Sequence, residues 1–144
     1  MISPEVRWET FAHGADIGVR GFGTTRERAF EAAALAVTGV ITDPASVRAS
    51  ERVAIACMGA DDELLLNAWL NAVITQMDLR RMLFARFEVT IAGTELTGSA
   101  WGEPVDVARH SPAVEVKGAT LTELEVRRGP DPIGGWVAQC VVDV

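Results

Sequence analysis

The sequence lacks the features by which secreted and membrane-spanning proteins are recognised. Its N-terminus has no apolar stretch of the kind that a signal peptide needs, and no apolar run approaches the length required to cross a bilayer. It contains only two cysteines, Cys57 and Cys140, in apolar segments where cysteine usually behaves as a small buried hydrophobe. The sequence alone leaves a disulfide between them open. We expect a cytoplasmic protein with no membrane partner.

Recognisable catalytic motifs are also missing. The chain has no phosphate-binding loop, dinucleotide fingerprint, Cys-x-x-Cys pair or nucleophile elbow. Its only histidines are His13 and His110, and the presence of Ser111 beside His110 does not by itself indicate a nucleophile–base pair. Both histidines are therefore expected to be structural or surface residues, and His13 gains interest only because Asp16 follows closely.

Positive charge is scarce. Lys and Arg number 13 against 20 Asp and Glu, which gives a formal net charge of −7. Because phosphate neutralisation needs clustered Lys and Arg, we expect no stable direct binding of nucleic acid. An acidic domain is better suited to binding cations or a basic protein surface.

What the chain does contain is the pattern of one domain covering residues 1–144, without repeats or a dividing linker. Two segments have apolar residues at helical spacing. The first is expected to begin at Thr24, with Glu27 completing a capping box, and to end at Thr42-Asp43-Pro44. The second is expected over about 62–81, with acids at its start and arginines at its end.

The remaining segments have the alternation and composition of strands. The expected strands cover residues 6–13, 16–23, 53–58, 84–92, 95–101, 105–108, 114–117, 121–127 and 136–144. Ala92-Gly93-Thr94 predicts a hairpin, and Gly129-Pro130-Asp131-Pro132 predicts a break before the last strand. The predicted fold class is α+β, a single-domain layered sandwich of largely antiparallel strands with two helices packed on the sheet.

Two acids stand out against this pattern. Asp143 lies within Val141-Val142-Asp143-Val144, an apolar run in which a buried charge is costly unless it is paired or holds a metal. Asp16 lies in His13-Gly14-Ala15-Asp16, between two expected strands. If the two acids meet in the fold, they form an oxygen-rich site with the Val144 carbonyl oxygen, which is part of the terminal carboxylate. Oxygen-only ligands suit Ca²⁺ or Mg²⁺ rather than zinc.

Each candidate residue also has an ordinary interpretation. Asp16 fits an Asx-turn acid beside Gly14. Asp143 fits a solvent-facing position on an edge strand, because alternation places Val142 and Val144 on the other face. Lys117 fits either a solvated strand lysine paired with a nearby acid or a cation that contacts phosphate or a partner's carboxylate. The sequence alone favours the ordinary interpretation for Asp16 and Lys117 and does not decide between the two for Asp143.

The order of several short segments resembles the archease family. The matching segments are His13-Gly14-Ala15-Asp16, Ala29-Phe30-Glu31-Ala32-Ala33, Glu63-Leu64-Leu65 with Trp69-Leu70, Gly102-Glu103, Glu115-Val116-Lys117 and Val142-Asp143-Val144. No single motif is specific, but the ordered set spans nearly the whole chain. Two positions depart from the family pattern: Gly14 replaces the usual threonine, and Ala12 stands where an aspartate often precedes the histidine. The second departure removes a carboxylate and would weaken metal affinity.

The resemblance implies a non-catalytic accessory protein of an RtcB-type RNA ligase, which joins tRNA exons or repairs cleaved RNA. Archeases promote GTP-dependent guanylylation of that ligase and so allow multiple turnover; GTP is used by the partner. By similarity, Asp16, Asp143 and the Val144 carbonyl would bind a divalent cation, with Ca²⁺ favoured over Mg²⁺ or Mn²⁺. Lys117 and His13 would be further functional residues.

Three alternative functions stay open at this point. One is a chaperone-like module for an RNA-modifying enzyme such as a tRNA methyltransferase. Another is a metal-dependent hydrolase that uses Asp16 and Asp143. The third is a generic protein-interaction domain. The oligomeric state, the docking surface and the choice between tRNA splicing and RNA repair are not indicated by the sequence.

Overall fold

Two long helices interrupt a series of strands in the computed structural model, which describes residues 6–129 and 135–144. In chain order they are β1 (Arg7–His13), β2 (Asp16–Gly23), α1 (Arg26–Ile41), the 3₁₀ helix η1 (Pro44–Ser46), β3 (Glu51–Met58), α2 (Asp62–Arg80), β4 (Met82–Ala92), β5 (Glu95–Pro104), α3 (Val107–His110), β6 (Gly118–Ala119), β7 (Glu125–Arg128) and β8 (Trp136–Asp143). No helix in the described part of the chain is long and apolar enough to span a bilayer.

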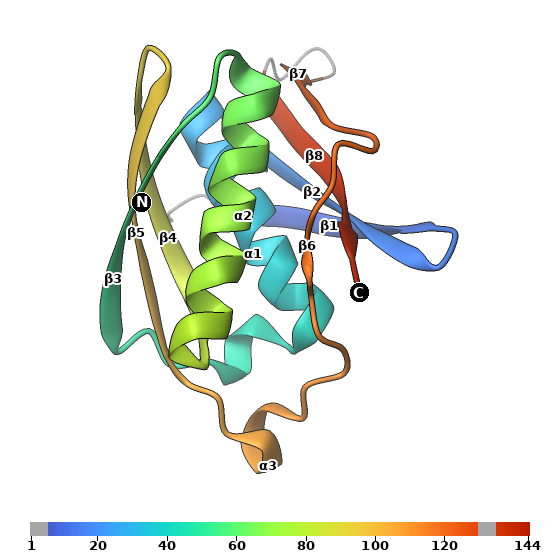
Figure 1. Cartoon of the computed structure of the whole chain (residues 1–144), viewed down its shortest axis with the longest axis vertical. Helices are drawn as coiled ribbons and strands as arrows, with labels where there is room; N and C mark the ends of the chain where they lie inside the picture. The colour runs from blue at the N-terminus through green and yellow to red at the C-terminus, as the bar shows by residue number, and fades with distance from the viewer. Residues whose placement is uncertain (1–5, 130–134) are drawn as a thin grey trace.

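Two antiparallel sheets enclose the two long helices. Sheet A has the strand order β1-β2-β8-β6, with β7 also paired to β8, and sheet B has the order β3-β5-β4. Figure 1 shows α1 and α2 between sheet B, on the left of the view, and sheet A, on the right. The predicted α+β layered sandwich is confirmed.

The start of α1 lies one residue later than predicted. Thr25, rather than Thr24, is the N-cap, because its extended backbone lets its hydroxyl accept a hydrogen bond from the Arg28 N–H at 3.2 Å. Glu27 therefore occupies the second helical position, and the predicted capping box is wrong. The predicted end at Thr42 is confirmed, since Thr42 is the C-cap.

α1 is buried on nearly all sides because it packs against both sheets. A Cβ at Gly21 of β2 would lie 2.2 Å from a backbone nitrogen of α1, so the close approach to sheet A requires glycine. On the other side, Glu31 accepts a hydrogen bond from the Val89 N–H at 2.9 Å, and the Thr38 hydroxyl donates to the Phe84 carbonyl at 2.6 Å. These buried polar side chains cover the outer edge of β4.

α2 was predicted to bury the stripe Leu65, Ala68, Trp69, Ala72, Val73 and Met77, and it also buries Leu66, Leu70 and Ile74. Asp61 caps it by accepting a hydrogen bond from the Leu64 N–H at 2.8 Å, and Arg81 ends it in the left-handed conformation, with φ of 53°. Because α2 contacts sheet B on one side and β6 and β7 on the other, residues beyond the predicted stripe are also buried. The buried residues are Leu65, Leu66, Trp69, Leu70, Val73, Ile74 and Met77.

The region between β5 and β6 differs most from prediction. Residues 105–108 do not form a strand: Asp106 accepts a hydrogen bond from the Arg109 N–H at 3.2 Å and so caps the short helix α3. Residues 114–117 are irregular, and only Gly118–Ala119 pairs with sheet A. β7 is also shorter than the predicted 121–127 strand. Of the predicted Gly129–Pro132 break, residues 130–132 lie outside the described part.

Both cysteines carry free thiols. Cys140 is fully buried in β8, and Cys57 is half-buried in β3. Burial raises the pKa of both thiols, that of Cys140 to about 12. The two thiols therefore behave as apolar packing groups rather than as reactive or bridging ones.

Candidate functional site

Asp16 and Asp143 lie at the same end of sheet A, on strands that are hydrogen-bonded neighbours. The antiparallel register ends with Ile17 paired to Val142, so Asp16 and Asp143 are the next residues on the two strands, and the Val144 N–H donates to the Asp16 carboxylate. Opposed residues on antiparallel strands have Cα atoms about 4.5–5.5 Å apart and side chains on the same face. The structure thus brings together two acids from opposite ends of the chain.

Both acids belong to the outer face of sheet A, away from the helices. Val19 on β2 and Val142 on β8 are fully buried in the core between the sheets. Because side chains alternate along a strand, Asp16 and Asp143 face the other way. Asp16 is half-buried and Asp143 is exposed. The end of this sheet therefore presents two carboxylates to solvent.

The expectation that Asp143 carries a charge inside a buried strand is wrong. β8 is buried from Val137 to Val142, but the side chain of Asp143 itself is exposed. The alternative of a solvent-facing position is confirmed, but β8 is not an edge strand, since β2 lies on one side of it and β6 and β7 lie on the other. Asp143 is a water-accessible acid at the end of an interior strand, where no desolvation penalty needs to be offset.

Val144 is tied to the same group. Its N–H donates a hydrogen bond to Oδ1 of Asp16 at 3.4 Å. This contact orients the Asp16 carboxylate, and among the described residues no other group donates a hydrogen bond to that carboxylate. The second carboxylate oxygen therefore has no competing protein donor there.

Lys117 joins the acids through the main chain. Its N–H donates to the Asp143 carbonyl at 2.8 Å, immediately before Gly118 pairs with Asp143. Lys117 is exposed, it is the only lysine in the sequence, and it forms no ion pair with any described acid. Its ammonium group therefore has no protein counter-ion among the described residues, and its main chain lies beside Asp143.

The turn before Asp16 accounts for one departure from the family pattern. β1 and β2 pair His13 with Asp16, which leaves a two-residue loop of Gly14 and Ala15. Gly14 has φ of +60°, a conformation that glycine adopts without strain and that favours tight hairpins. His13 is exposed and lies next to Asp16 in this register. The loss of a threonine hydroxyl at Gly14 thus accompanies a turn that suits glycine.

The donor set at this end of the sheet is small. No group of three or more His, Cys, Asp or Glu side chains within residues 6–129 and 135–144 is arranged to hold a metal ion. The candidate ligands are two carboxylates and main-chain oxygen, all hard donors of the kind that Ca²⁺ and Mg²⁺ use together with water. Ala12 contributes no carboxylate. Any cation bound at this sheet end would rely on water or on a partner for most of its ligands.

His110 has a structural role that the sequence did not reveal. It is buried, its Nδ1 accepts a hydrogen bond from the Asp106 N–H at 2.8 Å, and its Nε2 lies 3.0 Å from Oε2 of Glu103. Glu103 also accepts from Arg109 at 2.6 Å and from the Arg48 N–H at 2.7 Å. These contacts, with the Arg109 guanidinium foremost, lower the pKa of Glu103 to about 2. The sequence predicted a strand that ends at residue 101, and Glu103 lies beyond it, so no local pattern indicated this cluster.

Comparisons with known proteins agree over nearly the whole chain. The archease protein family (MTH1598/TM1083) matches residues 8–144. An archease of Pyrococcus furiosus is 38% identical over 142 residues, covering 96% of this chain and 99% of that protein. An archease of Methanosarcina barkeri is 33% identical over 149 aligned positions, with both chains fully covered.

A solved structure agrees as well. The solution structure of Methanobacterium thermoautotrophicum protein 1598 has a TM-score of 0.81 and 33% identity to this chain, covering 95% of this chain and 98% of that one. The fold, the extent of the matches and the level of identity point in one direction. The chain belongs to the archease protein family.

Proposed function

We propose that this protein is a metal-binding accessory protein that activates an RtcB-type RNA ligase. It would promote GTP-dependent guanylylation of the ligase and multiple turnover, in tRNA splicing or RNA repair. The observation that carries the proposal is the meeting of Asp16 and Asp143 at one end of sheet A in a member of the archease family. The proposal assigns the chemistry on GTP and RNA to the ligase and no catalytic residue to this chain.

The residues at this end fit a hard divalent cation, with few protein ligands. Asp16, Asp143 and the Val144 carbonyl would hold it, and Ca²⁺ tolerates such a site because it takes several oxygen ligands in flexible geometry. When bound, the cation would supply positive charge that attracts phosphate or carboxylate oxygens. The Val144 N–H donates a hydrogen bond to Oδ1 of Asp16 at 3.4 Å and orients this carboxylate without a cation.

Lys117 would add a positive charge for an anionic partner beside Asp16, Asp143 and Val144. A lysine ammonium is a compact point charge with three donors, which suits phosphate oxygens as well as carboxylates. Its main chain is fixed to Asp143 at 2.8 Å, so its position follows that of the acid. We propose that Lys117 offsets negative charge on the nucleotide or on acidic ligase residues when the two proteins meet.

The charge of the whole chain supports a protein partner rather than direct RNA binding. A net charge of −7 repels phosphate backbones and favours basic protein surfaces. A ligase that binds RNA must itself present basic surface. Long-range attraction would then speed the encounter of the two proteins, and this rate would fall as salt is raised.

The direct test is RNA ligation by the cognate RtcB-type ligase with RNA in excess over enzyme. We expect multiple turnover to require this protein and to be lost with Asp143→Ala. The matched control is Glu95→Ala, which removes an exposed acid at the far hairpin of sheet B. Turnover that is unaffected by this protein would contradict the proposal.

Two other outcomes would favour the alternative functions. Protection of a client enzyme from aggregation that survives Asp143→Ala and Lys117→Ala would favour a chaperone-like role. Cleavage of RNA or nucleotide by the isolated protein, lost with Asp16→Ala, would favour a hydrolase. Either result would replace the activator role.

A further inference from the structure

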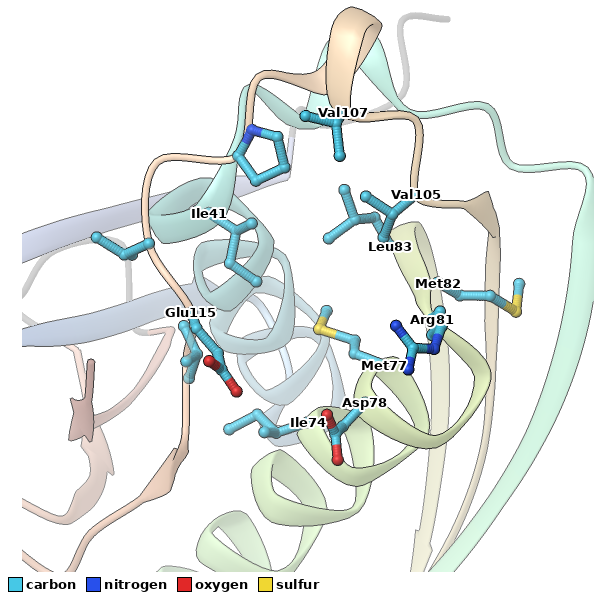
Figure 2. Close-up of a pocket in the computed structure, with 13 residues that line it drawn as sticks. Ile41, Ile74, Met77, Asp78, Arg81, Met82, Leu83, Val105, Val107 and Glu115 are labelled. Atoms are coloured by element: carbon cyan, nitrogen blue, oxygen red, sulfur yellow. The ribbon is translucent and has the colours of Figure 1, made fainter.

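A pocket of about 450 Å³ opens between the C-terminal ends of α1 and α2 and the irregular segment 105–117 (Figure 2). Ile41 of α1 and Ile74 and Met77 of α2 form its inner wall, and Val105 and Val116 belong to the facing segment. Its volume falls within the range of about 300–1,000 Å³ that is usual for pockets that bind ligands. Its lining does not include Asp16 or Asp143, the two acids at the end of sheet A.

The segment that forms the outer wall is fixed at several points. The Val105 N–H donates to the Arg81 carbonyl at 2.9 Å, and the Ala113 N–H donates to the Ile41 carbonyl at 2.8 Å. Between these points, Arg109 is held by Glu103 at 2.6 Å. The hydrogen bonds from Arg109 and from the Arg48 N–H lower the pKa of Glu103 to about 2, because they stabilise its ionised form. These contacts fix the outer wall of the pocket, so the pocket is preformed in the folded protein.

The lining is mainly apolar and partly adaptable. Ile41, Ile74 and Met77 expose less than a tenth of their surface, whereas Val105 exposes 37% and Val107 exposes 72%. Methionine side chains adjust to irregular apolar shapes. Apolar residues left exposed around a concave apolar floor are typical of surfaces that bind another molecule.

The charge at the mouth selects among possible occupants. Figure 2 shows Glu115 on the 105–117 segment and Asp78 on α2, on opposite walls of the pocket, with Arg81 on the same side as Asp78. Both acids are exposed, and neither forms an ion pair with a described residue. Two carboxylates against one guanidinium, in a chain of net charge −7, favour a cationic neighbour over an anionic one.

We propose that this pocket binds a segment of a partner protein that inserts a large apolar side chain and places a lysine or arginine beside it. The apolar side chain would fill the space over Ile74 and Met77, while the cation lies between Asp78 and Glu115. This inference goes beyond the proposed ligase activation and does not rest on it. A recessed apolar anchor with charged groups at its rim is a common design of protein interfaces.

The test uses short capped peptides of equal length and the full chain. One peptide is built from leucine and lysine, a second from leucine and glutamate, and a third from serine and lysine. Methyl signals of Ile41, Ile74 and Met77 are followed by NMR during titration. We expect the leucine–lysine peptide to shift these signals and to bind roughly threefold to tenfold more tightly than the leucine–glutamate peptide, since each exposed charge pair is worth little.

Matched variants separate the pocket from the general acidity of the surface. Val105→Trp should fill the mouth and abolish the methyl shifts, whereas Leu79→Trp, an equal change at an exposed α2 position outside the lining, should leave them. Asp78→Asn combined with Glu115→Gln should keep the fold, judged by its NMR spectrum, and remove the preference for lysine.

Three results would overturn the proposal. Equal binding of the serine–lysine peptide would mean that charge alone is recognised. Equal binding of the leucine–glutamate peptide would mean that the mouth does not select a cation. Methyl shifts that persist in Val105→Trp would place the binding elsewhere.

Discussion

The carboxylates of Glu103 and Asp143 differ in burial and in hydrogen bonding. Glu103 is buried and accepts hydrogen bonds from Arg109, from the Arg48 N–H and from the His110 Nε2–H, since His110 Nδ1 accepts from the Asp106 N–H. Asp143 is exposed, and it is tied to its neighbours through its main chain rather than through its carboxylate. The difference separates an acid that holds the fold together from an acid that is left available to other molecules.

The comparison shows that an acid in an unexpected place carries no function by itself. Asp143 ends an apolar strand in which a buried charge would have been costly, whereas Glu103 lies near the end of β5, a strand of mixed composition. The structure places the burial at Glu103 instead, where partners within the fold compensate for it. What distinguishes Asp143 is that it meets Asp16 at a solvent-exposed sheet end.

The largest functional effect is expected from Asp143→Ala. Loss of this carboxylate removes one of the two acids and should abolish activation of the ligase, since Asp16 alone cannot hold a hard cation. Stability should change by no more than about 0.5 kcal/mol, as for most exposed positions. Urea unfolding and multiple-turnover ligation measured on the same sample would check both. A large loss of stability would mean that Asp143, like Glu103, is needed for the fold.

The largest structural effect is expected from Glu103→Gln. The amide keeps the shape of the side chain but removes the charge that Arg109 and His110 surround. Arg109 is then left facing a neutral group, so the unfolding midpoint in urea should fall clearly. Ligase activation at a temperature where the variant is folded should persist. Loss of activation without loss of stability would mean that Glu103 acts in the functional site together with Asp16 and Asp143.

Low pH should lower the stability of the protein by protonating Glu103 in the same cluster. The pKa of Glu103 is lowered from its ordinary value of 4.5 to about 2, so its ionised form stabilises the fold above pH 4.5. This contribution should be lost progressively as the pH falls from about 4.5 toward about 2. Stability measured across this range should decline more steeply in the parent than in Glu103→Gln. Parallel curves would contradict the assignment.

A smaller effect is expected from Lys117. Lys117→Ala should reduce activation partially, because a point charge near the two acids is removed while both acids remain. Lys117→Arg should restore most of it if charge is what matters, and less if the compact ammonium contacts phosphate directly. Because Lys117 is the only lysine, amine-specific acetylation followed by mass spectrometry can monitor it; protection in the ligase complex is the expected result.

Much of the fold was predictable because its main elements carry strong local patterns. α1, α2, β2 and β8 were predicted within a few residues, since apolar periodicity and end signals agree in each. The segment 105–117 was not. Its alternating valines suggested strands, but the structure uses Val105, Val107 and Val114 to line a pocket, and periodicity does not distinguish lining from sheet pairing.

The candidate site was predictable only in part. Asp143 was notable as an acid in a strand-like run and Asp16 as an acid in the link between two strands, but their proximity depends on the pairing of β2 with β8, two strands far apart in the sequence. The Glu103 cluster depends on contacts with the Arg48 backbone and with His110, so it could not be inferred from residue types along the chain.

The decisive experiment compares Asp143→Ala with Glu103→Gln in one ligation assay, with RNA in excess over the cognate RtcB-type ligase. We expect Asp143→Ala to stay folded and fail to support turnover, while Glu103→Gln is less stable and still supports turnover below its unfolding temperature. Full activation by Asp143→Ala would show that the sheet end formed by Asp16 and Asp143 is not the functional site.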